Sequence, residues 1–89
     1  MIKKDVTIIN KLGLHARAAA KFVSLASRFE SKLMVSRNDR EVNGKSIMGI
    51  MMLAASQGTV ITLSAEGVDE QNAIDALAEL INNRFEEDE

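Results

Sequence analysis

The sequence predicts an α+β fold, an open-faced β-sandwich in which a four-stranded antiparallel sheet is covered on one face by three helices. Three observations predict it: short segments rich in β-branched residues, segments with apolar residues at helical spacing, and their order, β-α-β-β-α-β-α. At 89 residues the chain has room for one hydrophobic core. No linker or repeat interrupts it, so we expect a single domain over residues 1–89.

The first strand is expected in "KKDVTIIN", where Val6 and Ile8 alternate with Thr7 and Ile9. A helix is expected over residues 16–29, because its apolar residues recur at helical spacing. These apolar residues are Ala19, Phe22, Val23 and Ala26. The first unit is therefore strand, loop and helix.

The middle of the chain predicts a β-hairpin followed by a short helix. The strands are "SKLMVSR" and "REVNG", and they turn at Asn38 and Asp39. In "GKSIMGIMMLAASQG", Ser46 is suited to cap the helix and Gly58 to end it.

The last third predicts one strand and one helix. "TVITLSA" is the clearest strand of the chain, and beyond Gly67 the residue Asp69 is expected to cap a helix in "EQNAIDALAELINNRF". The apolar stripe of this helix consists of Ala73, Ile74, Leu77, Leu80 and Ile81. The acidic tail "EEDE" is expected to be frayed and solvated.

Composition excludes several kinds of function. The chain has no cysteine and one histidine, which argues against disulfides, a zinc site or another metal cofactor. A net charge of −2 and three aromatic residues argue against nucleic-acid binding. No apolar run approaches the ~20 residues that span a bilayer, and the N-terminus lacks a signal-peptide pattern. We expect no membrane insertion and a cytoplasmic protein.

The single histidine lies in "GLHARAAAKF", where Gly13 and Leu14 form a loop and His15 takes the cap position of the first helix. The first turn of a helix offers unpaired N–H groups and a positive dipole end, which suit an anion. A neutral imidazole is a nucleophile, and Arg17 is placed to add a charge-assisted bond to a phosphoryl group. Phosphate carriage is one interpretation; a capping histidine beside a solvated arginine is the other, and spacing alone does not separate them.

The second helix start, "NGKSIMG", poses a similar choice. Ser46 is either a plain cap or a serine whose phosphorylation the helix dipole would accommodate. Ile50 and Leu53 of this helix are expected in the core. For Met48 and Met51 the pattern is equally compatible with core packing and with an exposed partner contact.

Three blocks, "NKLGLHARAAAKFVSLASRF", "VNGKSIMGIMMLAASQGT" and "SAEGVDEQNAIDALAELI", together resemble the HPr family, the histidine-containing phosphocarriers of the bacterial phosphoenolpyruvate-dependent phosphotransferase system. The resemblance runs in order from about residue 2 to residue 85. It implies that His15 is phosphorylated on a ring nitrogen by enzyme I and passes the group to enzyme II A components, with Arg17 assisting at the phosphate. Such a carrier is a protein co-substrate with no turnover of its own, needs no cofactor, and is expected to be a monomer.

The resemblance also implies a regulatory site and a docking surface. Ser46 corresponds to a site used by an ATP-dependent HPr kinase/phosphorylase in many members. The positions expected to dock the partners are Leu14, Ala16, Ala20, Ile47, Met48, Met51 and Met52. Salt-sensitive docking is expected from acidic partner surfaces facing Arg17, Lys21 and Lys45.

One residue departs from the family pattern, which usually reads histidine, alanine, arginine, proline. Ala18 stands in the proline position. Because alanine is a good helix former, we expect the helix to survive with a loss of a few tenths to about 1 kcal/mol through the entropy of the unfolded chain.

Two alternatives remain at this point. The nitrogen-related paralogue, NPr, shares the histidine motif and an acidic C-terminal end, although "GKSIMGIMML" fits the serine-regulated HPr branch better. The other is a regulatory interaction module in which His15 is structural and the methionine-rich helix binds a regulator.

Overall fold

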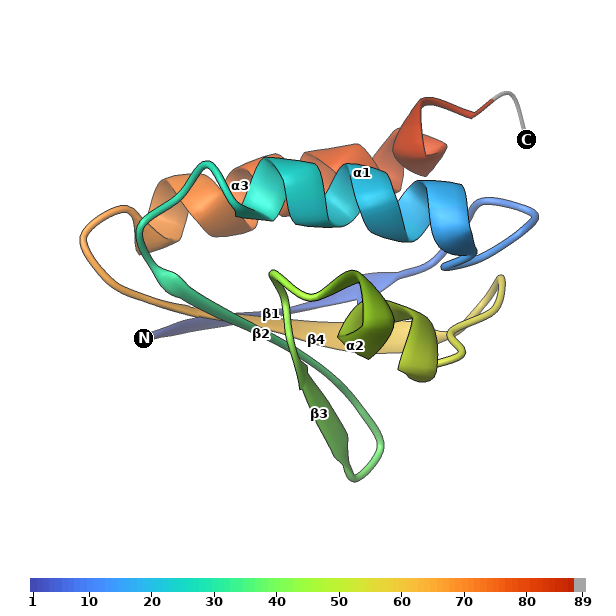
Figure 1. The fold of residues 1–89 in the computed structure, drawn as a ribbon, viewed down its shortest axis with the longest axis horizontal. Coiled ribbons are helices and arrows are strands. Elements are labelled where there is room, and N and C mark those ends of the chain that lie inside the picture. The colour runs from blue at the N-terminus through green and yellow to red at the C-terminus, as the bar shows by residue number, and fades with distance from the viewer. Residues whose placement is uncertain (88–89) are drawn as a thin grey trace.

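The computed structural model describes residues 1–87, and its elements follow the predicted order (Figure 1). The elements are β1 (Ile2–Thr7), α1 (Ala16–Ala26), β2 (Lys32–Arg37), β3 (Arg40–Asn43), α2 (Ile47–Met52), β4 (Val60–Glu66), α3 (Glu70–Asn82) and the 3₁₀ turn η1 (Arg84–Glu86). The predicted fold class is confirmed, with four strands and three α-helices in the described chain.

The four strands form one antiparallel sheet in the order β1-β4-β2-β3. The pairing of β1 with β4 joins segments far apart in sequence, with Val6 opposite Ile61. The β2–β3 hairpin closes through the predicted two-residue turn, since Arg37 pairs with Arg40. Asn38 has a φ of 56° there, a left-handed conformation that asparagine tolerates.

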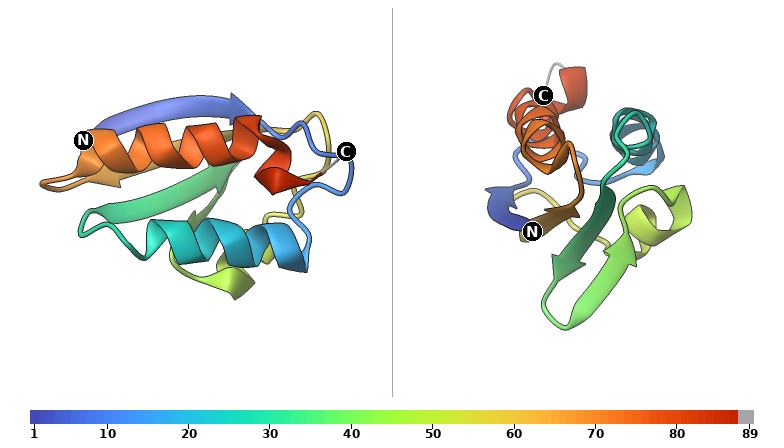
Figure 2. Two further views of the ribbon diagram at one scale, coloured as in Figure 1. Left: turned by 90° about the horizontal axis from the view of Figure 1, so that it is seen from above. Right: turned by 90° about the vertical axis from the view of Figure 1, so that its left-hand side faces the viewer.

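The helices α1 and α3 lie side by side over one face of the sheet, and the opposite face is left uncovered (Figures 1 and 2). They run in opposite directions, so the start of α1 and the end of α3 lie at the same end of the molecule (Figure 2). The short helix α2 packs against α1 and β3. This arrangement brings the loop before α1 close to the C-terminal turn.

The core fills the space between the sheet and the two long helices. Ile61 and Leu63 of β4 contribute to it from the sheet, and Phe22 of α1 and Leu77 of α3 contribute to it from the helices. Each is almost completely buried, and burying such a side chain contributes about 1.5–3 kcal/mol relative to leaving it in water.

The C-terminal end differs from the prediction. The helix α3 ends at Asn82, and the next turn is left-handed, with φ between 54° and 63° at Arg84, Phe85 and Glu86. Phe85 is fully buried, so the tail folds back onto the domain. The expectation of a frayed, solvated "EEDE" is therefore wrong for Glu87, which contacts His15 and is largely buried. Glu86 is solvent-exposed, as expected, but it lies in the ordered turn η1 and is not frayed. Residues 88 and 89 lie outside the described chain.

Two helix ends also differ from the sequence prediction. The helix α1 ends at Ala26 and not at residue 29, because the following N–H groups of Arg28 and Phe29 bond three residues back in a tighter turn. Asp69 occupies the N-cap position of α3, but its side chain does not cap that helix.

The Asp69 carboxylate instead holds the loop that follows α1. It accepts hydrogen bonds from the Ser31 hydroxyl, the Glu30 N–H at 2.9 Å and the Ser31 N–H at 3.0 Å. The Ser31 hydroxyl bond, followed by the Glu30 bond, lowers the pKa of Asp69 below its ordinary value. The start of α3 is thus tied to the loop after α1.

Gly13 and Gly58 both adopt positive φ, +66° and +91°, but their surroundings differ. A Cβ atom at Gly13 would lie 2.5 Å from the backbone oxygen of Ala55, whereas one at Gly58 would meet nothing within 4 Å. Of these two glycines, it is Gly13 at which the close approach of two loops requires the absence of a side chain.

We expect Gly58→Ala to lower the free energy of unfolding by about 1–2 kcal/mol, the cost of a left-handed alanine. Gly13→Ala adds a backbone collision and should lower it by about 2–5 kcal/mol. Urea unfolding of the two variants measures both values. Equal losses would show that the Ala55 loop moves freely away from Gly13.

Candidate functional site

His15 is the N-cap residue of α1, as predicted. Its backbone is extended, with φ −74° and ψ 177°, and its carbonyl accepts the first helical bond, from the Ala19 N–H at 2.9 Å. The imidazole makes no capping hydrogen bond. The side chain is therefore available for another contact, and 29% of its surface is exposed.

The loop before His15 is held by two hydrogen bonds. The Leu14 N–H donates to the Ala55 carbonyl at 2.9 Å, and the Asn10 side-chain amide donates to the Gly13 carbonyl at 2.9 Å. Asn10 is fully buried. The position of the imidazole is thus fixed from both sides of the loop.

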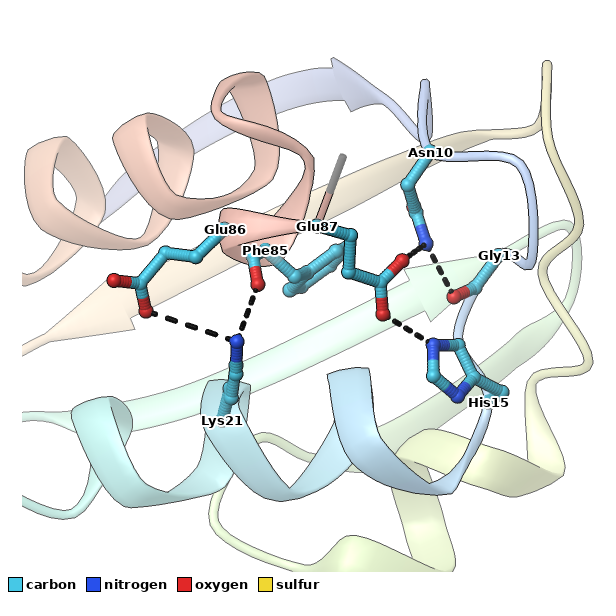
Figure 3. Close-up of polar contacts among 7 residues, drawn as sticks. All are labelled: Asn10, Gly13, His15, Lys21, Phe85, Glu86 and Glu87. Atoms are coloured by element: carbon cyan, nitrogen blue, oxygen red, sulfur yellow. Dashed lines mark hydrogen bonds and ion pairs between the residues drawn. The ribbon is translucent and has the colours of Figure 1, made fainter. Parts of the chain in front are cut away.

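The partner of the imidazole comes from the other end of the chain (Figure 3). The His15 Nε2 atom lies 2.5 Å from Oε2 of Glu87, and Asn10 Nδ2 donates to Oε1 of the same carboxylate at 3.0 Å. Only 13% of the Glu87 side chain is exposed. One carboxylate therefore bridges the histidine and the residue that holds its loop.

Burial by itself raises the pKa of Glu87, but the hydrogen bonds from His15 and Asn10 outweigh it. The pKa of Glu87 is consequently below its ordinary value of 4.5. Glu87 is ionised at neutral pH and places a negative charge against the Nε2 edge of the imidazole.

Lys21 of α1 fixes the turn that carries Glu87. Its Nζ donates to the Phe85 carbonyl at 2.8 Å and lies 3.9 Å from Oε1 of Glu86 (Figure 3). An open depression lies here, lined by Lys11, Arg17 and Lys21 together with His15 and the two glutamates. Its cationic side chains suit an anionic group.

Arg17 is exposed and, within residues 1–87, its side chain forms no hydrogen bond or ion pair. It lies in the first turn of α1, two residues after His15, and lines the same depression. The N–H groups of this turn have no partner within the helix, and such groups are suited to bind an anion. Ala18, which stands where the family usually has proline, is fully buried. The helix α1 is intact around it, as expected.

The second helix start also has the predicted geometry. Ser46 Oγ accepts a hydrogen bond from the Gly49 N–H at 3.1 Å, and Ile50 and Leu53 are buried in the core. The Lys45 ammonium differs from the expectation, because it donates to the Phe29 carbonyl at 2.7 Å and is half-buried.

The expected docking positions divide into two groups. Met48 is 71% exposed, and the other three apolar residues of α2 that were expected to dock partners are also exposed. These residues form the α2 patch: Ile47, Met48, Met51 and Met52. Ala16 is exposed and Ala20 is half-buried. Leu14 corrects the expectation, because it is only 5% exposed and packs in the core, where it anchors the loop from inside.

The chain matches the family model described as "PTS HPr component phosphorylation site" over residues 2–83. The chain belongs to the HPr family. The phosphocarrier protein HPr of Cupriavidus necator is 60% identical over 89 residues, covering all of both chains. Among solved structures, HPr-C-His from Thermoanaerobacter tengcongensis matches with a TM-score of 0.96 and 53% identity over the whole of both chains. An HPr dimer from the same organism matches with a TM-score of 0.79 and 54% identity over 98% of this chain and 100% of that one.

Three residues of this HPr-family site were missed by the sequence analysis: Asn10, Lys21 in its contact with Phe85, and Glu87. The sequence carries no signal for the His15–Glu87 contact, because 72 residues separate them and the acidic tail resembles a solvated end. Among the described residues, no cluster of acidic or histidine side chains is suited to a metal ion. No helix of residues 1–87 has the length and hydropathy to cross a membrane.

The lowered pKa of Glu87 predicts a pH dependence. A carboxyl group whose pKa is lower in the folded than in the unfolded chain contributes stability above its ordinary value of 4.5, and this contribution is lost as the pH falls through the lowered value. Urea unfolding from neutral pH into acid should show wild type more stable than Glu87→Gln at neutral pH, with the difference shrinking below pH 4.5. A constant difference across this range would contradict the lowered pKa.

Proposed function

We propose that this protein is a phosphocarrier: His15 accepts a phosphoryl group from phospho-enzyme I and passes it to enzyme II A components. The observation that carries the proposal is the position of a partly exposed imidazole at the N-terminus of α1, in a chain that belongs to the HPr family. The protein is then a co-substrate of its partners and completes no reaction alone.

The surroundings of His15 support this chemistry. A phosphoryl group on the ring meets the unpaired N–H groups of the first turn of α1 and the positive end of the helix dipole. Arg17 and Lys21 line the same depression and offer cationic groups to the phosphoryl oxygens. The imidazole is reachable by a partner protein because almost a third of it is exposed.

The α2 patch supports a role in docking. Exposed methionines adapt their shape to different surfaces, which suits a carrier that meets a donor and several acceptors in turn. The helix α2 packs against α1, and we propose that both helices contact the same partner. We further propose that the protein acts as a monomer, since one face then serves each partner in succession.

The first test is to incubate the purified protein with enzyme I and phosphoenolpyruvate and to measure its intact mass. We expect the gain of one phosphoryl group, because His15 is the only histidine and is accessible. The added group should be lost in mild acid, as expected of a phosphohistidine, and should be absent in His15→Ala.

Ser46→Ala is a suitable control in the same assay, since it leaves the imidazole and its contacts in place. No mass gain in wild type, with an enzyme I shown to be active, would contradict the proposal. Partner binding that persists unchanged in His15→Ala without any phosphorylation would favour an interaction module.

We also propose that phosphorylation of Ser46, by a kinase of the HPr kinase/phosphorylase type, regulates docking. Ser46 is half-exposed at the start of α2 and directly precedes Ile47 and Met48 of the α2 patch. A phosphoserine adds up to about two negative charges at this surface. An acidic partner surface would then be repelled.

Ser46→Asp should slow phosphorylation by enzyme I, and Ser46→Asn should not. Asparagine and aspartate are equally good N-caps, so both variants retain α2 and differ only in charge. Initial rates at limiting enzyme I, at low and high salt, measure the effect. Equal rates for the two variants would remove the charge-based regulation.

A further inference from the structure

The strongest unexplained feature of the structure is the left-handed turn at Arg84, Phe85 and Glu86. Residues other than glycine rarely adopt positive φ in succession, because Cβ approaches the following carbonyl oxygen. Such a conformation persists when the surrounding structure holds it, and it is often found at functional sites.

Several contacts hold this turn. Phe85 is fully buried, its carbonyl accepts the Lys21 ammonium at 2.8 Å, and the Glu87 N–H donates to the Arg84 carbonyl at 2.9 Å. The result is that Glu87, close to the end of the chain, is directed at His15 Nε2 (Figure 3). A solvated acidic tail would need none of these contacts.

We propose that Glu87 is a positioning residue for phosphoryl transfer: its carboxylate accepts the Nε2–H of His15, which leaves Nδ1 as the nucleophile and sets a negative charge beside the ring. The inference rests on the proposed function of His15 as phosphoryl acceptor.

The tautomer follows from the contact itself. An ionised carboxylate is only an acceptor, so a neutral imidazole that bonds to it at 2.5 Å carries its proton on Nε2. The lone pair is then on Nδ1, and among residues 1–87 no group forms a hydrogen bond with that atom. A histidine whose second nitrogen is held by a carboxylate is fixed in tautomer and orientation.

In the transfer step, the Nδ1 lone pair forms a bond to phosphorus while the bond between phosphorus and the donor atom of phospho-enzyme I breaks, its electron pair leaving on the donor. Nε2 keeps its proton, so the ring becomes positive as the new bond forms. The Glu87 carboxylate stabilises this charge through the same hydrogen bond. When the group is passed on, the electron pair returns to Nδ1 and the ring is neutral again.

A carboxylate is needed because two donors converge on it. Oε2 meets His15 Nε2 and Oε1 accepts Asn10 Nδ2. A glutamine has one acceptor oxygen and an amide that is a donor, so it cannot accept hydrogen bonds from both the Nε2–H of His15 and Asn10 Nδ2. Glu87→Gln therefore tests the charge and the double acceptance with little change of shape.

The experiment compares wild type, Glu87→Ala, Glu87→Gln and the control Glu79→Gln. Glu79 is an exposed carboxylate of α3 that does not line the depression beside His15, so its variant removes the same charge away from the site. Two quantities are measured: the tautomer of His15, from two-bond ¹H–¹⁵N correlations of the ring, and the rate of phosphorylation by enzyme I and phosphoenolpyruvate.

We expect wild type and Glu79→Gln to carry the proton on Nε2, and Glu87→Ala to show a mixture of tautomers. The phosphorylation rate of Glu87→Ala should fall roughly tenfold or more, as for other groups that orient a histidine, and that of Glu87→Gln should fall as well. A tail that serves only as a tether would leave the tautomer unmoved.

An unchanged tautomer in Glu87→Ala, or equal phosphorylation rates for it and wild type, would overturn the positioning role. The outcomes separate the two proposals. Normal phosphorylation of all four proteins leaves the carrier intact and rejects the role of Glu87, whereas a wild type that is never phosphorylated rejects the carrier whatever the tautomer is.

Discussion

The site depends on one packing constraint, the antiparallel arrangement of α1 and α3 on a single face of the sheet. Because the two helices run in opposite directions, the N-terminal end of α1 lies beside the C-terminal end of α3 (Figure 2). The N-cap residue of α1 and the segment that follows α3 therefore meet. Two contacts hold the C-terminal turn against the domain: Phe85 packs into the core, and the Lys21 ammonium donates a hydrogen bond to the Phe85 carbonyl.

This constraint gives the single histidine two different sides. One edge of the ring, at Nε2, is held by Glu87 in a partly buried setting. The depression beside the ring, which Glu86 and Glu87 also line, includes the cationic side chains of Arg17 and Lys21, and the start of α1 adds unpaired N–H groups. Negative charge on the first side suits a ring that becomes positive, and positive charge in the depression suits an incoming phosphoryl group.

The loop before α1 shows how little freedom this site has. Gly13 passes so close to the backbone of Ala55 that it leaves no room for a Cβ, and Leu14 is turned inward to the core. Leu14 thus differs from the docking residues expected from the family resemblance. The α2 patch, in contrast, is exposed because a short helix at the side of the sheet buries only one of its faces, through Ile50 and Leu53.

Local pattern determined the elements, the fold class and the cap positions of His15 and Ser46. Alternation, helical spacing and capping act within a few residues, and such signals are written in the sequence itself. The tertiary structure decided the rest: the left-handed turn after α3, the use of Asp69 to hold the Ser31 loop, and the contact between Glu87 and His15. Each of these depends on groups 38 to 72 residues apart, or on the burial of Phe85, and their proximity exists only once the helices have packed on the sheet.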